Sequence, residues 1–392
     1  MKSEWNTSAI ANICKVVTDG SHTSPKSVSH GKYMVSVKDF TPYGFDFNGC
    51  RQISFADYEK LKSSGCVPQK GDILIGKDGA RYFEDIIIYN QDEAPALLSS
   101  IAILRCDEEK VIPEYLYYLL KTPSFKKDVK DNYGSGSAIP RIILKDFKRM
   151  KVKYPSIEKQ RQIVSILHDL DAKIFNNQKV NDNLEQQAAA LFSSLYNRSN
   201  TEVRYTDLIQ ILGGGTPKTG ETAYWNGNIA FFTPKDVGTP YTFITEKTIT
   251  EEGLSHCNSR LYPVNTVFVT ARGTVGKVGL SGVPMAMNQS CYALVGKETH
   301  QLLVYFYTLK AVDRLKHKAS GAVFDAITTR DFDSEQIMKL SDDDAKAFLC
   351  VAEPMFQEIL NNSIENLRLS TLRDFLLPKL MSGEIDVSSV QL

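Results

Sequence analysis

The chain has 392 residues, 42% of them apolar, which is enough for two or three domains with buried cores. Its 46 basic and 46 acidic residues cancel, which excludes a uniformly basic or acidic protein. No stretch approaches the ~20 apolar residues that cross a bilayer, and the N-terminus lacks a charged-then-apolar signal pattern. We therefore expect a cytoplasmic protein that makes no membrane contact.

The seven cysteines are scattered along the chain and form no Cys-x-x-Cys pair. The six histidines are equally isolated, and no His-Glu-x-x-His motif occurs. We therefore expect neither a disulfide framework nor a bound metal ion.

The first predicted domain spans residues 1–155. Short apolar strands such as 72–75 alternate with turn residues, and a Tyr- and Leu-rich helix is predicted over 113–120, which is typical of a mixed α+β domain. Residues 121–153 hold ten basic residues and only three acidic ones. This basic stripe fits a phosphate-binding face, although charge alone favours an ordinary solvated surface equally.

A long helix is predicted over 156–200, with Ser156 as its N-cap. Apolar or Asn residues recur at alternating spacings of four and three, which is the heptad pattern of a coiled-coil seam. These seam positions are Ile163, Leu167, Leu170, Ile174, Asn177, Asn181, Leu184, Leu191 and Leu195.

The second predicted domain, 201–340, repeats the landmarks of the first domain in the same order. The matched pairs are 20–26 and 213–218, 35–39 and 231–236, 72–75 and 266–269, 77–81 and 271–277, 113–120 and 302–309, and the Gly/Ser turns 134–139 and 320–324. The spacings between landmarks drift by several residues. The sequence therefore predicts two related domains that have diverged.

A second helix, predicted within 341–392, matches the first without a gap at an offset of 185 residues. Its seam positions are Phe348, Met355, Ile359, Asn362, Asn366, Leu369, Leu376 and Leu380. Arg373 occupies a seam position, so we expect that end of the seam to splay or to admit a partner. Pro378 is expected to end or kink the helix near Leu377.

Both helices carry Asn at matching seam positions, which penalises wrong alignments of a helix pair. We therefore expect an α+β protein in which two mixed α/β domains are separated by two long helices that form an antiparallel coiled coil of roughly 50 Å. The duplication also predicts a pseudo-two-fold internal repeat. A plain helical hairpin core between two domains, with no partner, is the alternative.

This arrangement resembles the specificity subunit of type I restriction–modification systems, over essentially the whole chain. The residues that carry the resemblance are Ile157-x-x-Gln160-x-x-Ile163-Val164-x-Ile166-Leu167-x-x-Leu170-Asp171-x-x-Ile174, the ending 376–385 (LLPKLMSGEI), and the opening 213–218 (GGGTPK) of the second domain. The order and the duplication of these features are more specific than any single motif.

The resemblance implies two target-recognition domains that each read one half of an asymmetric bipartite DNA site, 1–155 and 201–340. It also implies two spacer helices, 156–200 and 341–392, that set the gap between the half-sites. The implied partners are double-stranded DNA, two methyltransferase subunits and restriction subunits. The chain itself is expected to bind no cofactor, whereas the other subunits of the complex use S-adenosylmethionine, ATP and Mg²⁺.

Motifs for catalysis are missing from the sequence. It contains neither the Asn/Asp-Pro-Pro-aromatic motif of DNA methyltransferases nor a Walker A loop. Asp92 followed by Glu108-Glu109-Lys110 is the pattern closest to a metal-dependent nuclease, but it has no counterpart in the second domain. We therefore expect a non-catalytic protein.

The DNA-binding candidates are basic or amide residues in or near the repeated landmarks, because Arg and Lys contact phosphates or guanine and Gln reads adenine. They are Lys26, Lys77, Arg81 and Arg141 in the first domain, and Lys218, Lys235, Arg272, Lys277 and Gln289 in the second. For each one, a turn residue or a surface charge is the alternative interpretation. For the whole chain, the alternatives are a duplicated coiled-coil scaffold that binds proteins, or a nuclease that uses Asp92 and Glu108.

Overall fold

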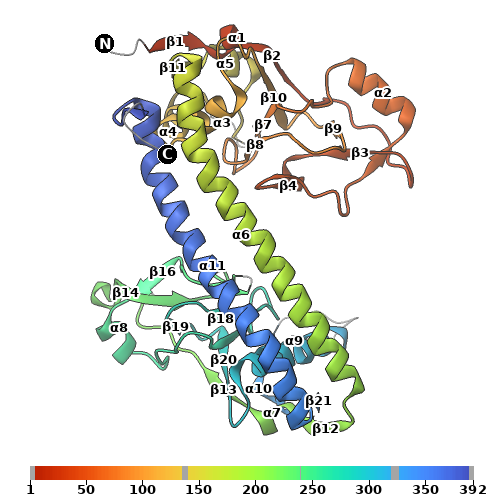
Figure 1. The fold of residues 1–392 in the computed structure, drawn as a ribbon, viewed down its shortest axis with the longest axis vertical. Helices are drawn as coiled ribbons and strands as arrows, with labels where there is room; N and C mark the ends of the chain where they lie inside the picture. The colour runs from red at the N-terminus through yellow and green to blue at the C-terminus, as the bar shows by residue number, and fades with distance from the viewer. Residues whose placement is uncertain (1–4, 135–139, 239, 319–325, 388–392) are drawn as a thin grey trace. The chain divides into compact units, whose positions relative to one another are not determined.

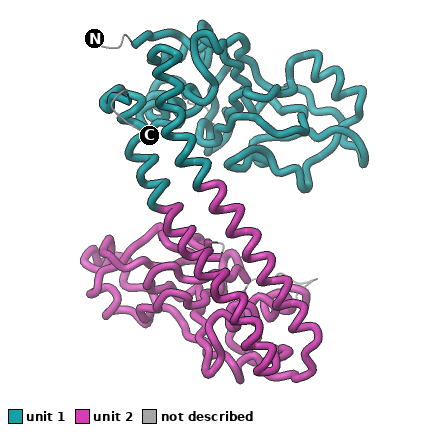
Figure 2. The backbone as a smooth tube through the Cα atoms, in the orientation of Figure 1, with its two compact units in different colours: residues 1–173, 368–392 teal, residues 174–367 magenta. Residues whose placement is uncertain are grey.

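The computed structural model describes residues 5–134, 140–238, 240–318 and 326–387 (Figure 1). The chain divides into two compact units, 1–173 with 368–392 and 174–367 (Figure 2). Most of the Gly/Ser turns predicted at 134–139 and 320–324 lies outside the described residues. No helix within the described part of the chain is long and apolar enough to span a membrane.

Unit 1 contains a four-stranded antiparallel sheet in the order β2-β10-β7-β8, a mixed three-stranded sheet β6-β3-β9, and the pairs β1-β11 and β4-β5. Its strands are β1 (Asn6–Ala9), β2 (Cys14–Asp19), β3 (Lys32–Val35), β4 (Phe40–Thr41), β5 (Gly44–Phe45), β6 (Gln52–Ile53), β7 (Ile73–Gly76), β8 (Ile86–Ile88), β9 (Ala96–Leu97), β10 (Ile101–Cys106) and β11 (Lys151–Tyr154). Its shorter helices are α1 (Ile10–Ile13), η1 (Val37–Asp39), α2 (Phe55–Ser63), α3 (Pro113–Lys121), α4 (Pro123–Asn132) and α5 (Leu144–Arg149).

Unit 2 repeats this topology. Its sheets are β13-β20-β17-β18-β15 and the mixed sheet β16-β14-β19, beside the pair β12-β21. The strands are β12 (Thr201–Arg204), β13 (Ile209–Gly213), β14 (Trp225–Phe232), β15 (Tyr241–Thr242), β16 (Lys247–Ile249), β17 (Val267–Thr270), β18 (Val278–Ser281), β19 (Met285–Met287), β20 (Cys291–Gly296) and β21 (Gln336–Lys339). The shorter helices are α7 (Tyr205–Leu208), η2 (Thr222–Tyr224), α8 (Glu251–Ser255), α9 (Gln301–Lys318) and α10 (Thr329–Ser334). The mixed α+β class expected from the sequence is confirmed.

The equivalent strands β7 and β17 are covered on both faces. Ile73 and Ile75 of β7 enter the core that contains α3, whereas Leu74 enters a second core on the opposite face. In β17, Val267 and Val269 likewise join the core with α9, and Phe268 joins another. Side chains alternate between the faces of a strand, so an uninterrupted apolar strand needs a partner layer on each side. This explains why both strands read as continuous apolar runs.

Two long helices contribute to both units, α6 (Ile157–Arg198) and α11 (Asp342–Ser382). The division into two recognition domains and two spacer helices stays a prediction. Ile163 and Leu167 of α6 pack in the core of unit 1 with Leu380 of α11, while Leu195 and Phe348 lie in the core of unit 2. The seam therefore belongs to the two domain cores as well as to the helix pair.

In unit 2, α6 and α11 run antiparallel. The Asn177 side chain donates to Asn366 Oδ1 at 2.9 Å, and the Asn362 side chain donates to Asn181 Oδ1 at 2.9 Å. All seventeen predicted seam residues are buried or half-buried in the structure.

In unit 1, the seam position Arg373 does not splay. Its Nη1 donates to Asp171 Oδ1 at 2.7 Å, and the Tyr118 hydroxyl donates to Asp171 Oδ2 at 2.7 Å. The expectation that this end of the seam splays is therefore wrong, because Asp171 on the facing helix pairs with the guanidinium.

The prediction for Pro378 was an end or a kink of the helix near Leu377, and an end is wrong because α11 continues through Pro378 to Ser382. A proline inside a helix removes one hydrogen bond and costs about 3 kcal/mol. Leu377, Leu380 and Met381 are all buried in the core of unit 1. Each such side chain contributes roughly 1.5–3 kcal/mol, which offsets the cost of the proline.

Candidate nucleic-acid interface

A Ser/Thr-x-Lys-Asp turn follows the first strand of the mixed sheet in each unit. In unit 1, the Ser36 backbone N–H and hydroxyl donate to Asp39 Oδ2 at 2.7 and 3.1 Å. In unit 2, the Thr233 N–H and hydroxyl donate to Asp236 Oδ2 at 2.8 and 2.6 Å. The third residue of each turn is an exposed lysine, Lys38 or Lys235. The repeated hydrogen bonds thus present one lysine in the same way in both units.

A second turn, after β7 or β17, contains a glycine with positive φ. Gly79 has φ of 95° and Gly273 has φ of 81°, a backbone conformation that favours glycine. The preceding residue forms an isolated antiparallel bridge in each case, Asp78 with Arg141 and Arg272 with Ala326. The same turn is therefore built twice, with different side chains.

The two turns border a depression in each unit, of about 450 Å³ in unit 1 and about 460 Å³ in unit 2. The first depression is lined by Val37, Lys38, Phe40, Gly76, Asp78, Gly79, Ala80, Arg81 and Asp85. The second is lined by Thr233, Pro234, Lys235, Glu246, Lys247, Arg272, Gly273, Thr274, Asn288 and Ser290. In unit 2, the Thr274 hydroxyl donates to the Pro234 carbonyl at 3.1 Å, which joins the two turns.

The two depressions differ in charge. In unit 1, Lys38 and Arg81 are balanced by Asp78 and Asp85, and Arg81 Nη2 lies 2.8 Å from Asp85 Oδ1. In unit 2, the lining holds three basic residues and one acidic residue, Glu246. The second depression is therefore the more favourable of the two for a phosphate group.

The structure brings Lys235 and Arg272 together in the second depression and places Arg81 in the first. Lys26, Arg141, Lys218 and Lys277 are also exposed but do not line either depression. Gln289 is exposed, and its side-chain oxygen accepts a hydrogen bond from the Thr216 hydroxyl. Asn288, the residue before it, lines the depression instead.

The structure corrects the prediction that Lys77 contacts DNA. It is 6% exposed, and its Nζ lies 3.4 Å from Asp19 Oδ2 and 3.6 Å from Asp78 Oδ1. A lysine in a turn ordinarily faces solvent, but here Asp19 at the end of β2 supplies a buried partner. We therefore assign Lys77 to the interior of the turn.

Glycines near the start of each domain fit close packing of the backbone. A Cβ on Gly214 would lie 2.1 Å from the Asn288 carbonyl oxygen, and one on Gly20 would lie 2.3 Å from that of Leu97. Here they allow the chain to approach its own backbone.

Sequence reasoning missed Lys38, Lys247 and Asn288. Lys38 could have been found from the shared Ser/Thr-x-Lys-Asp pattern, because Lys235 at the same position was already a candidate. Lys247 and Asn288 come from β16 and the turn after β19, and no local motif marks them. Their approach to the depression depends on strand pairing.

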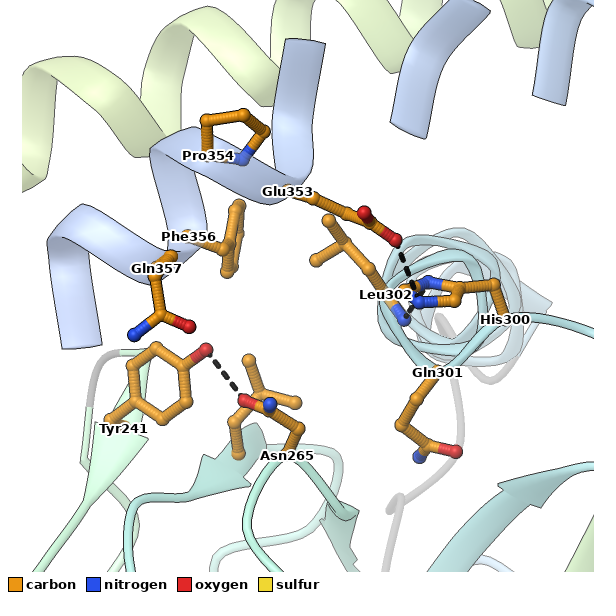
Figure 3. A pocket seen from close by; sticks show the side chains of 10 residues that line it. Tyr241, Asn265, His300, Gln301, Leu302, Glu353, Pro354, Phe356 and Gln357 are labelled. Atoms are coloured by element: carbon orange, nitrogen blue, oxygen red, sulfur yellow. Dashed lines mark hydrogen bonds and ion pairs between the residues drawn. The ribbon is translucent and has the colours of Figure 1, made fainter. Parts of the chain in front are cut away.

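Another pocket in unit 2, of about 490 Å³, does not suit a nucleic acid (Figure 3). The Tyr241 hydroxyl donates to Asn265 Oδ1 at 2.8 Å, and His300 Nε2 lies 2.7 Å from Glu353 Oε1. Leu302 and Phe356 supply apolar walls. Its lining carries a carboxylate beside His300 and neither lysine nor arginine, so the pocket suits a phosphate group less well than the second depression does.

The pattern closest to a nuclease does not form a metal site. Asp92 is exposed, and its Oδ1 lies 2.7 Å from Lys70 Nζ. Glu108 and Glu109 lie in an exposed turn before α3. Throughout the part of the chain that the structure describes, no three His, Cys, Asp or Glu residues gather as metal ligands.

Comparison with known proteins supports the interpretation of two DNA-reading units. Residues 2–186 and 197–339 match the family described as type I restriction modification DNA specificity domain. The chain is 24% identical over 310 residues to the MjaIX specificity subunit of Methanocaldococcus jannaschii, covering 72% of this chain and 71% of that protein. It is 24% identical over 406 residues to the HindI specificity subunit of Haemophilus influenzae, covering 81% and 87%.

The fold also matches a solved structure. The type I restriction–modification S subunit from M. genitalium aligns with a TM-score of 0.60 over 97% of this chain and 96% of that chain, at 14% identity. At this identity, the match supports the fold alone.

Proposed function

Because the chain belongs to the family of type I restriction–modification DNA specificity subunits, we propose that each of its two units reads one half of an asymmetric bipartite DNA site. One observation carries this proposal: the same two turns border a depression in both units, but the side chains around it differ. Two copies of the same pair of turns, with different side chains around each depression, suit two different half-sites. The family match favours DNA recognition over a scaffold that binds only proteins.

The paired helices are proposed to set the gap between the half-sites. Asn177 with Asn366, and Asn181 with Asn362, hold α6 and α11 in one register within unit 2. A fixed register is what a spacer of constant length requires, since sliding by one heptad would bury the Asn side chains against apolar neighbours. The helices are also proposed to dock two methyltransferase subunits.

The subunit is proposed to be non-catalytic. In the full complex, chemistry belongs to the methyltransferase subunits, which use S-adenosylmethionine, and to restriction subunits, which use ATP and Mg²⁺. This chain selects the DNA sequence on which the complex acts.

The experiment that tests the function is co-expression of the full chain with its cognate methyltransferase subunit, followed by mapping of methylated bases across the host genome. An asymmetric bipartite motif with a gap of constant length is expected. A continuous motif, or no motif from a complex that is shown to assemble, would contradict the proposal. DNA binding that weakens steeply as the salt concentration rises is expected in parallel.

A further inference from the structure

Asp78 and Arg272 occupy the same backbone position in the two units. Each one precedes the glycine of positive φ and forms an isolated bridge with the segment before α5 or α10. The residue before each also matches, since the Lys77 carbonyl accepts from Ile142 N at 3.0 Å and the Ala271 carbonyl accepts from Ile327 N at 2.9 Å. Two different side chains thus occupy equivalent positions in the same backbone structure.

The neighbouring lysine is the same in both units. Lys38 and Lys235 follow equivalent Ser/Thr-x-Lys-Asp turns and line the two depressions. A feature common to both units suits what is common to both half-sites, which is the phosphate backbone. A position that differs suits what differs between them, which is the bases.

The two side chains differ in how much of each group is open to a base. The Asp78 side chain is 31% exposed, but its Oδ1 is buried inside the turn, 3.6 Å from Lys77 Nζ, so Oδ2 is the oxygen that can accept from a base. Arg272 is exposed at the edge of the second depression. Among the residues that the structure describes, none accepts a hydrogen bond from its guanidinium.

The chemistry of the two groups is opposite. An arginine donates two parallel N–H groups to O6 and N7 of guanine in the major groove. A carboxylate is repelled by phosphates, and it gains most by accepting a hydrogen bond from the N4 amino group of cytosine.

We infer that Asp78 and Arg272 are the specificity-determining pair of the two recognition units, with Arg272 reading a guanine in one half-site and Asp78 reading a cytosine in the other. This inference rests on the proposed function and names the residue of each unit that selects a base. The lysines at 38 and 235 hold the phosphates on either side.

The test uses the full complex with Arg272→Lys and Asp78→Asn, each mapped by genome-wide methylation and by binding to single-base variants of the motif. Arg272→Lys keeps the charge but loses the planar pair of donors. It is expected to relax one guanine position, with discrimination falling roughly 5- to 150-fold, while the other half-site and the gap stay unchanged. Asp78→Asn is expected to relax one cytosine position in the other half-site by a similar factor.

Matched controls are Arg260→Lys, an exposed arginine in unit 2, and Asp92→Asn, an exposed aspartate in unit 1. Both controls are expected to leave the motif unchanged. Arg272→Asp provides a second variant, and it should abolish recognition of the guanine.

An unaltered motif in the Arg272 variants, with binding weakened equally at every sequence, would show a phosphate contact and overturn the inference. An unaltered motif with unaltered binding would also overturn it. Both outcomes leave the proposed function intact, because the wild-type complex in the same experiment still produces its bipartite motif. If the wild-type complex produces no such motif, the proposed function fails, and this inference fails with it.

Discussion

The side-chain amide of Asn362 donates to Asn181 Oδ1 at 2.9 Å, and both residues are less than 10% exposed. The Asn181 amide nitrogen in turn donates to Ser363 Oγ at 3.3 Å. Shifting one helix by a heptad would place Asn181 opposite Met355 or Leu369, neither of which has a side chain that can form a hydrogen bond with the Asn181 amide. The pair therefore selects a single alignment of α6 and α11 in unit 2.

Replacing one member of this pair should cost more than replacing both. Asn362→Leu removes the donor to the buried Asn181 Oδ1, so we expect a loss of about 1–3 kcal/mol in the free energy of unfolding. The double variant Asn181→Leu/Asn362→Leu should recover most of that loss, since both positions become apolar. Urea denaturation of the two variants measures the difference.

The control for this prediction is Asn361→Leu, the same substitution at the neighbouring exposed position. It should change stability by less than about 0.5 kcal/mol. A double variant as unstable as the single one would show that the amide pair does not set the alignment.

The Arg373–Asp171 ion pair in unit 1 should show measurable coupling in a double-mutant cycle. Both side chains are 25% exposed, and Asp171 is also held by the Tyr118 hydroxyl. We expect a coupling energy of about 1–2 kcal/mol, because a half-buried pair is less screened than a surface one. The exposed pair Arg204–Asp207 is the matched control and should give about 0.2–0.5 kcal/mol. Equal coupling energies in the two cycles would mean that the Arg373–Asp171 pair stabilises the seam no more than an exposed ion pair stabilises the surface.

The lysines of the two Ser/Thr-x-Lys-Asp turns should act on affinity rather than on sequence preference. Each phosphate contact contributes about 0.9 to the slope of log K against log salt concentration. Lys235→Ala should therefore reduce the magnitude of this slope by about 0.9, with an unchanged motif, and Lys38→Ala should do the same. Lys62→Ala, on the exposed face of α2, is the control. A slope that stays constant in both turn variants would remove these turns from the interface.

Glu84 should give unit 1 a stability component that depends on pH. Hydrogen bonds from Lys126 and Lys130, at 2.8 and 2.5 Å, lower the pKa of Glu84 below its ordinary value of 4.5. Because the folded pKa lies below the unfolded one, this component is complete above about pH 4.5. It is lost as the pH falls through the lowered pKa. These contacts fasten the turn that carries Arg81 to α4.

The pH prediction is tested with Glu84→Gln. The wild-type protein should be more stable than this variant at pH 7, by less than about 1 kcal/mol since the lysines are partly exposed. The difference should shrink as the pH is lowered below 4.5. Chemical denaturation at a series of pH values measures it. A difference that grows toward low pH would reverse the sign and refute the assignment.

The sequence predicts the long helices well because their signals are local and repeated. The seam spacing recurs at an offset of 185 residues, and Ser341 caps α11 by accepting from Asp344 N at 3.1 Å. The order of landmarks in the two domains likewise predicts the shared topology. Pro378 misleads because its local cost is outweighed by burial of its neighbours in the core of unit 1.

The composition of the candidate site is harder to predict, because it depends on contacts between distant segments. Lys77 and Asp19 are 58 positions apart, and no sequence pattern near Lys77 indicates that Asp19 is its buried partner. Asn288 and Gln289 are adjacent and chemically similar, but only the first lines the depression. Which of the two does so is decided by the pairing of β19 with β14, at Phe232–Met287.

The helix pair offers a test of the proposed spacing role. Asp171 faces Arg373 in unit 1, and Asn177 faces Asn366 in unit 2. Inserting one heptad into both helices, between 171 and 177 in α6 and between 366 and 373 in α11, preserves both sets of contacts. Seven residues at 1.5 Å add about 10 Å, or about three base pairs. Methylation mapping should find the same two half-sites with a gap longer by about three base pairs.

The matched control is the same heptad inserted into α6 alone. It displaces Asn177 and Asn181 from Asn366 and Asn362, or Asp171 from Arg373, so the protein should lose stability and the complex should lose activity. The double insertion should restore both. If the double insertion assembles and methylates DNA but the gap is unchanged, the helices do not set the spacing. If the half-site sequences change instead, the inserted segment acts on recognition, and the separation of roles between domains and helices is refuted.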